Sequence, residues 1–177
     1  AKVSTSDFNV EEARDLERRI SLFLLCNFVY YNEEEVKHLM KVMIQNYIHA
    51  YFLKQDKNNI NDSEIDELIR KTTFSPLGNQ SESSSYMLYM FRQVNDLSKY
   101  DFEDKKDSEN IVFVDDFSIT GTQANRYIKK YLESHPDKIH KKISVLLMLS
   151  TQDAVQKIES IKELMRNLNL SPEKAMK

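Results

Sequence analysis

The apolar positions of the N-terminal third recur every three or four residues. From about Val10 to Tyr31 this spacing predicts one amphipathic helix. Asn32 followed by Glu35 has the pattern of a capping box, so a second helix is predicted to begin at once and to end near Leu53 or Gln55. Because the connection is so short, we expect the two helices to form an antiparallel or sharply bent pair.

Further along the chain the pattern changes to short, unbroken apolar runs. The runs Ile111 to Val114 and Ile143 to Leu149 contain β-branched residues and polar flanks, which is typical of strands buried on both faces of a parallel sheet. From Thr122 onward the spacing is helical, and a third short strand is predicted at Thr72 to Ser75. Strand, helix and strand in this order predict a right-handed βαβ unit.

The predicted fold class is therefore α/β, with a parallel sheet and an N-terminal helical hairpin. We expect the hairpin to occupy residues 1–56 and the α/β domain residues 57–177. Two strands with continuous apolar runs and a third short strand are few for a free-standing sheet of this kind. Either further strands lie within residues 86–101, or the domain is completed elsewhere.

Composition narrows the function only slightly. A hydrophobic content of 41% is sufficient for a core, and a net charge of −3 argues against a general electrostatic attraction to nucleic acid. No apolar stretch approaches the roughly 20 residues of a membrane-spanning helix. The single cysteine, Cys26, has no partner for an internal disulfide and lies in an apolar helical pattern. We expect it to be a buried thiol in a reducing compartment, which suggests the cytoplasm.

The stretch with the clearest chemistry follows the first apolar run. Two carboxylates, Asp115 and Asp116, are followed by a short loop with Gly121, one of only two glycines in the chain, and then by a helix. Amides at a helix N-terminus bind phosphate, and the glycine is expected to let the backbone approach it closely. Thr120 and Thr122 add hydroxyl donors. Carboxylates accept hydrogen bonds from sugar hydroxyls or hold a divalent cation, directly or through water. The combination predicts a sugar-phosphate site.

A second loop has a similar character. Residues 79–85, with the sequence NQSESSS, precede a helix predicted from Tyr86 to about Leu97. Hydroxyls before a helix predict either a second anion site, with Ser81 and Ser83 as donors, or a polar loop that ends in an ordinary helix cap.

The segment VFVDDFSITGTQ, residues 112–123, resembles the phosphoribosyl-pyrophosphate motif of the type I phosphoribosyltransferases. The resemblance implies that Asp115 and Asp116 contact the ribose hydroxyls. It also implies that the loop from Ser118 to Gln123 holds the 5′-phosphate, through Ser118, Thr120, Gly121, Thr122 and Gln123. It implies magnesium as the cofactor, held mainly by the ligand's oxygens and by water. Asp115 and Asp116 are the candidate protein ligands of the metal, directly or through water.

Two departures from the family pattern affect the expected activity. Ile119 stands where catalytic members usually carry Thr, Ser, Gly or Asp. The pyrophosphate loop, which usually has adjacent glycines and a basic residue, has its nearest counterpart in residues 74–81, FSPLGNQS. That segment is similar to the divergent phosphoribosyltransferase-like domains of bacterial multi-domain and defence-associated proteins.

Three functional interpretations stay open at this point. The first is a transferase that moves a phosphoribosyl group from its pyrophosphate donor. The second is a catalytically degenerate module that senses a nucleotide or mediates protein interactions in a larger assembly. The third is a receiver-like phosphorelay domain, because VDDFS also resembles the acidic pocket of receivers; only 61 residues follow Asp116, however, which is too few. The N-terminal helices are predicted to mediate any homodimer or larger assembly.

Overall fold

The computed structural model describes residues 10–26, 30–57, 59–78, 83–97, 108–138 and 140–161. The chain divides into two units, Ala1–Glu35 and Val36–Lys177, whose relative position is not defined. The first unit contains helix α1, Val10–Cys26. Helix α2, Glu33–Leu53, begins in the first unit and continues into the second. Among the described residues, no helix is both long enough and apolar enough to cross a bilayer.

The capping box predicted at Asn32 is present. The Asn32 amide donates to Glu35 Oε2 at 2.8 Å, and the Glu35 amide donates to Asn32 Oδ1 at 3.0 Å. This exchange satisfies two amides that a helix start would otherwise leave without acceptors. The sequence therefore placed the start of α2 correctly. The packing of α1 against α2, and the domain boundary near residue 56, stay predictions.

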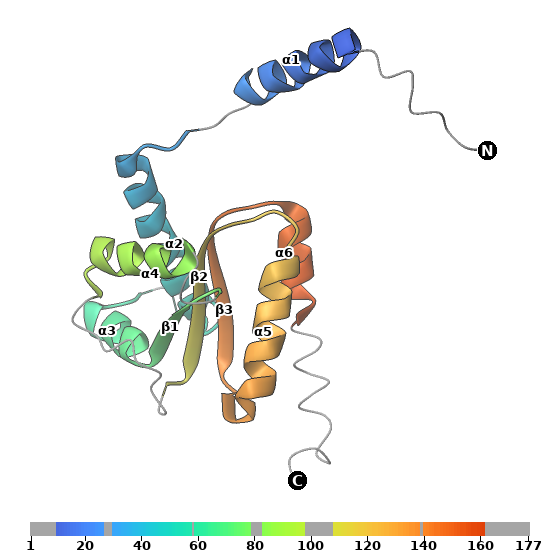
Figure 1. Cartoon of the computed structure of the whole chain (residues 1–177). Helices are drawn as coiled ribbons and strands as arrows, with labels where there is room; N and C mark the ends of the chain where they lie inside the picture. Colours follow the sequence, from blue (N-terminus) through green and yellow to red (C-terminus); the bar gives the residue numbers. More distant parts are fainter. Residues whose placement is uncertain are drawn as a thin grey trace. The chain divides into compact units, whose positions relative to one another are not determined.

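The second unit is an α/β fold built on three parallel strands (Figure 1). Strand β1, Thr72–Pro76, pairs with β2, Asn110–Ser118, which pairs in turn with β3, Lys142–Ser150. The order β1-β2-β3 places β2 in the centre. The remaining helices are α3 (Asp62–Arg70), α4 (Ser83–Val94), α5 (Thr122–Ser134), a 3-10 turn at Pro136–Lys138 and α6 (Gln152–Glu159).

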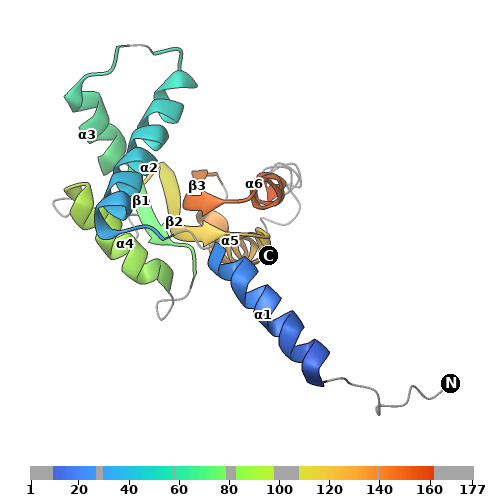
Figure 2. The ribbon, with the colours of Figure 1, turned by 90° about the horizontal axis from the view of Figure 1, so that it is seen from above.

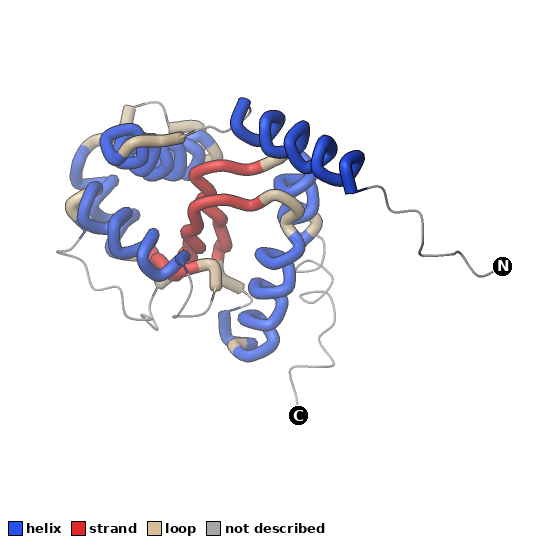
Figure 3. Tube along the Cα trace, turned by 45° about the horizontal axis from the view of Figure 1, so that its top comes forward, coloured by secondary structure: helices blue, strands red, loops and turns tan. Residues whose placement is uncertain are grey.

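Helices cover both faces of the sheet, as Figures 2 and 3 show. Val112 and Val114 point to one face, where they join a core with α2, α3 and α4. Ile111 and Phe113 point to the other face and pack with α5 and with Ile158 of α6. All four side chains are fully buried. This double burial explains why the run is continuously apolar rather than alternating.

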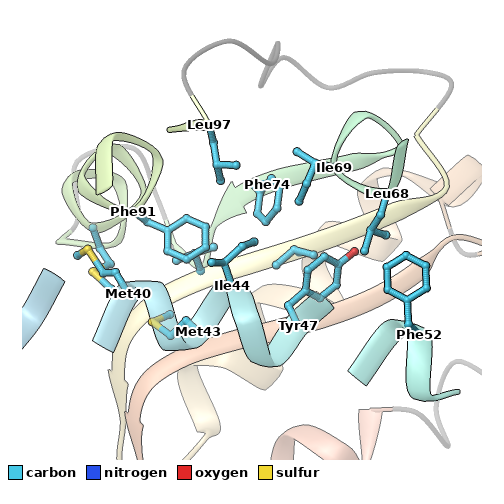
Figure 4. Close-up of a cluster of buried hydrophobic side chains, with 13 residues drawn as sticks. Met40, Met43, Ile44, Tyr47, Phe52, Leu68, Ile69, Phe74, Phe91 and Leu97 are labelled. Atoms are coloured by element: carbon cyan, nitrogen blue, oxygen red, sulfur yellow. The ribbon is translucent and has the colours of Figure 1, made fainter. Parts of the chain in front are cut away.

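The larger core contains aromatic and sulfur-containing side chains, many of them labelled in Figure 4. Tyr47 lies at its edge, and its hydroxyl is 3.0 Å from Thr72 Oγ1. Thr72 Oγ1 donates its only proton to the Leu68 carbonyl at 2.7 Å, so Tyr47 must donate to Thr72. Burial raises the pKa of Tyr47 to about 12.

Four sequence expectations are corrected by the structure. Strand β2 continues to Ser118, so Asp115 and Asp116 lie inside the strand rather than at its tip, because β3 is long enough to pair with it as far as Ser150. Helix α4 begins at Ser83, three residues before the predicted start, so Ser83 is a helical residue. The sequence also predicts a short helix capped by Asp62 or Ser63, whereas the cap of this helix, α3, is Asn61.

The fourth correction concerns Cys26, which is exposed rather than buried. Leu16, Ile20 and Phe23 of the same helix are also at least half exposed. The apolar spacing identified the helix correctly, but spacing carries no information about what covers the apolar face.

The raised pKa of Tyr47 predicts a specific alkaline instability. The unfolded tyrosine ionises near pH 10 and the folded one near pH 12, so stability that is complete below pH 10 is lost progressively between these values. At about 1.4 kcal/mol per pKa unit, the loss amounts to up to about 3 kcal/mol. Urea unfolding at pH 8.5 and pH 11.5 measures it. Tyr47→Phe should show a smaller loss than the wild type, whereas Tyr89→Phe, at an exposed position, should match the wild type.

Candidate functional site at the carboxyl edge of the sheet

The carboxyl ends of the three strands form one edge of the sheet, and β2 extends furthest along it. The last pair between β1 and β2 joins Pro76 to Val114, whereas β2 and β3 continue as partners to Ser118 and Ser150. From Asp115 onward, therefore, β2 has a strand neighbour on one side only. In open α/β sheets, ligands bind in the crevice beyond the carboxyl ends of the strands.

Both predicted acids lie in this one-sided part of β2 and are half-buried. Each carboxylate accepts a hydrogen bond from the amide of the following residue. The Asp116 amide donates to Asp115 Oδ1 at 3.0 Å, and the Phe117 amide donates to Asp116 Oδ1 at 2.8 Å. Because side chains alternate along a strand, Asp115 shares the α5 face with Phe113, and Asp116 shares the α4 face with Val114. The two carboxylates therefore lie on opposite faces of the sheet at its carboxyl edge.

The loop from Ser118 to Gln123 is held in place by the start of α6. Thr151 caps α6, since its hydroxyl accepts from the Ala154 amide at 3.2 Å. The same hydroxyl donates to the Ile119 carbonyl, and the Thr151 amide donates to the Ser118 carbonyl at 3.2 Å. One residue thus fastens the loop to a neighbouring helix. Ile119, Thr120, Thr122 and Gln123 are exposed, and Ser118 is half-buried.

Gly121 is required by the packing of the loop against α6. It is buried, its φ is +65°, and a Cβ placed on it would lie 2.7 Å from the Ala154 carbonyl oxygen and 3.2 Å from Lys157 Cβ. A side chain would therefore be strained in its backbone conformation and would collide with α6. The glycine therefore allows α5 to begin directly against α6.

The N-terminus of α5 keeps unpaired donors beside this packing contact. The first helical hydrogen bond runs from the Asn125 amide to the Gly121 carbonyl at 2.9 Å. Within the described part of the chain, the amides of Gln123 and Ala124 have no acceptor, whereas the Thr122 amide donates to Thr120 Oγ1 at 3.4 Å. These groups carry the positive end of the helix dipole.

Lys157 is a site residue that the sequence analysis missed. Its Nζ donates to Thr122 Oγ1 at 2.8 Å, and its carbonyl accepts from Asn125 Nδ2 at 3.1 Å. A cation beside a helix N-terminus is electrostatically unfavourable unless an anion is close to both. The available signal was its spacing, because Lys157 follows the buried Ala154 by three residues and so lies on the face of α6 that meets α5.

The second predicted loop is described only in part. Leu77 is buried, and its amide donates to the Val114 carbonyl at 3.1 Å, which continues the path of β1. Ser81 lies outside the described residues, and Ser83 is the exposed first residue of α4. Among the described residues, three buried side-chain oxygens have no hydrogen-bond partner, and two of them, Ser84 Oγ and Ser85 Oγ, belong to the first turn of α4.

The described residues contain no group of three His, Cys, Asp or Glu side chains that could hold a metal ion.

A family model named PRTase-CE, phosphoribosyltransferase-like, matches residues 7–176, nearly the whole chain. The chain belongs to the PRTase-CE family. The expected relation to the phosphoribosyltransferases is thereby confirmed, and the three-stranded α/β unit agrees with a fold of this type. Membership of PRTase-CE leaves the receiver-like interpretation without support. No curated protein and no solved structure matches the chain.

The contact between Gly121 and α6 predicts a stability defect in Gly121→Ala. The new Cβ meets the Ala154 carbonyl and adopts a positive φ, so we expect a loss of about 1–3 kcal/mol in the free energy of unfolding. Urea denaturation measures this loss. Gln123→Ala, at an exposed position two residues away, serves as the matched control and should change stability by less than about 0.5 kcal/mol. An unchanged denaturation midpoint in Gly121→Ala would contradict the packing described here.

Proposed function

We propose that the carboxyl edge of the sheet binds a ribose 5-phosphate or phosphoribosyl-pyrophosphate type of ligand. The observation that carries the proposal is the juxtaposition at the start of α5. Two amides without acceptors, those of Gln123 and Ala124, lie at the positive end of a helix whose Thr122 hydroxyl also contacts the Lys157 ammonium. This arrangement follows a strand that carries two carboxylates, in a chain of the PRTase-CE family.

The 5′-phosphate would bind at the loop from Ser118 to Gln123. A phosphate there would accept hydrogen bonds from the free amides and from the exposed Thr120 and Thr122 hydroxyls. Lys157 Nζ would add a charge-assisted hydrogen bond to the phosphate. The negative charge of the phosphate would also offset the repulsion between this ammonium and the positive end of the helix dipole. Thr151 donates hydrogen bonds to the Ser118 and Ile119 carbonyls, so the loop already has a fixed conformation before a ligand binds.

The ribose would lie across the edge of the sheet, because the two acids face opposite sides of it. Asp115, on the α5 face, would accept from a hydroxyl near the phosphate loop, and Asp116 would contact the sugar from the α4 face. The pyrophosphate end would then approach the first turn of α4, the segment of Ser81 and Ser83 proposed from the sequence. The buried, unpaired hydroxyls of Ser84 and Ser85 support this orientation. Magnesium, when bound, would neutralise charge on the ligand's phosphate oxygens.

If the domain transfers the phosphoribosyl group, the bond between C1 of the ribose and the pyrophosphate oxygen breaks as the acceptor forms a bond to C1. The bonding electron pair leaves with pyrophosphate. The sugar passes through a cationic state, so the protein's task is to position the reactants and to stabilise charge. Asp115 and Asp116 would supply negative charge near that cation, and the N-terminus of α5 would bind the 5′-phosphate at the other end of the sugar.

A second candidate, a nucleotide-sensing or protein-interaction module that does not catalyse, is favoured by two exposed apolar side chains, one near the end of β2 and one in the loop. Ile119 is 62% exposed and Phe117 is 56% exposed. These residues offer no hydrogen bonds to a reacting ligand, and they present apolar surface next to the proposed site. Ligand binding is common to the transferase and to a sensor, so turnover distinguishes these two.

Isothermal titration with phosphoribosyl pyrophosphate and with ribose 5-phosphate, each with and without Mg²⁺, tests the binding site. We expect Lys157→Gln and Thr122→Ala to weaken binding by about tenfold or more, because a hydrogen bond to a charged group contributes about 1.5–3 kcal/mol. Asp115→Asn should weaken binding of both compounds, since both contain ribose. Lys129→Gln removes the same charge from an exposed position of α5 outside the proposed site and serves as the control. Equal affinities for Lys157→Gln and Lys129→Gln would reject the phosphate site.

A pyrophosphate-release assay with Mg²⁺ separates the transferase from the sensor. If Ile119 limits turnover, Ile119→Thr should raise the rate of pyrophosphate release by about tenfold, the gain expected from about 1.4 kcal/mol of new transition-state stabilisation. Asp116→Asn in the same background should abolish the gain. Binding without release in both Ile119→Thr and the wild type would assign the domain to ligand sensing.

A further inference from the structure

Strand β3 has one free edge. Its neighbour is β2, and among the described residues no strand pairs with its other side. The Lys142 amide donates to the Glu109 carbonyl at 3.0 Å, in the direction of β2. Because the residues of a parallel strand direct their backbone groups alternately to the two sides, Ile143, Val145 and Leu147 point their amides and carbonyls away from β2.

A groove of about 400 Å³ runs along this free edge. Side chains of β3 form the floor of the groove. Tyr47, Ala50 and Lys54 of α2 line one wall, and Val155 and Ile158 of α6 line the other. The lining is mostly apolar overall, but Asn46 and Lys54 on the α2 side and Glu159 on the α6 side are polar or charged. The loop proposed to hold phosphate does not line it, so the groove is a separate feature of the same unit.

The free edge lacks the features that keep an edge strand from pairing. Native proteins protect such edges with proline, inward-pointing charges, bulges or short strands. Strand β3 has nine residues and no proline, and its only charged residue is Lys142 at the start. Seven residues in its middle, Ile143 to Leu149, include a single polar side chain, Ser144. A strand of this kind is expected to have a partner strand in solution.

We propose that the partner is β3 of a second copy of this chain, paired antiparallel about a two-fold axis at Leu146. In that register the outward-facing Val145 and Leu147 of the two copies exchange backbone hydrogen bonds. Ser144 lies opposite Met148, so a small side chain meets a large one. The interface is self-complementary, as a two-fold dimer requires, and it continues the sheet across both copies.

The charges at the two ends of β3 favour the antiparallel arrangement. Lys142 is exposed at the start of the strand, whereas the end leads into α6, whose exposed first turn carries Asp153. Antiparallel pairing brings the Lys142 end of each copy next to the Asp153 end of the other. Parallel pairing would place like charges together. An unrelated extended peptide would gain the same backbone hydrogen bonds but not this matching of both ends.

Disulfide trapping tests the register directly. At the proposed axis Leu146 faces its own copy as a pair without mutual hydrogen bonds, with Cα atoms about 4.5 Å apart, which is within the range of a disulfide. In a Cys26→Ser background, which removes the only native cysteine, Leu146→Cys should form a covalent dimer under mild oxidation. Ser144→Cys, on the same face two residues away, faces Met148 of the other copy and should form much less. Equal cross-linking of the two variants would overturn the proposed register.

Sedimentation equilibrium of the full chain tests the dimer itself. The wild type should be dimeric at tens of micromolar, and Val145→Pro should raise the dimer dissociation constant at least tenfold. This proline removes an amide that points outward, so the pairing with β2 and the circular dichroism spectrum should be retained. Ser144→Lys should act in the same direction, and Gln156→Lys, the same charge change at an exposed α6 position that does not line the groove, should leave the dimer intact. A monomeric wild type, or a dimer that persists in folded Val145→Pro, would overturn the proposal.

Discussion

The structure depends on the complete burial of four consecutive residues in β2. Ile111, Val112, Phe113 and Val114 have no exposed surface, and they point alternately into the two cores. Each large side chain buried in this way contributes about 1.5–3 kcal/mol, and a sheet with helices on one face only would leave two of the four exposed. The requirement for a helical layer on both faces fixes β2 at the centre. It also directs the ends of all three strands to the same edge.

The unequal lengths of the strands then create the proposed site. Strand β1 ends opposite Val114, while β3 accompanies β2 to Ser118, so the acidic residues occupy a stretch of β2 that is paired on one side only. Their carboxylates bond to amides of the next residues in this stretch. On the opposite side, the length of β3 brings Thr151 and α6 to the loop that follows. Strand β3, which extends the sheet beside the proposed site, also has a long side that faces away from β2 and pairs with no other described strand.

Helix α6 contributes more to the proposed site than its position in the sequence suggests. Ala154 provides the surface on which Gly121 packs, Thr151 anchors the loop, and Lys157 reaches Thr122. Each of the three residues is more than 30 positions along the chain from the loop residue that it contacts. A phosphate bound at this loop would therefore also connect α5 to α6. Ligand binding should stabilise the packing of these two helices, because a ligand that binds only the folded state shifts the unfolding equilibrium.

The sequence by itself determined the elements whose signal is local. Continuous apolar runs identified β2 and β3, three-to-four spacing identified α5, and the Asn32–Glu35 capping box located the start of α2. The motif around Asp115 and Asp116 was sufficient to indicate the family. Four features could be seen only in the folded structure. They are the end of β2, the exposure of Cys26, the packing of Gly121 against α6 and the hydrogen bond from Lys157 to Thr122. Each of these depends on contacts between segments distant in the chain, and neither periodicity nor a short motif records which segments will meet.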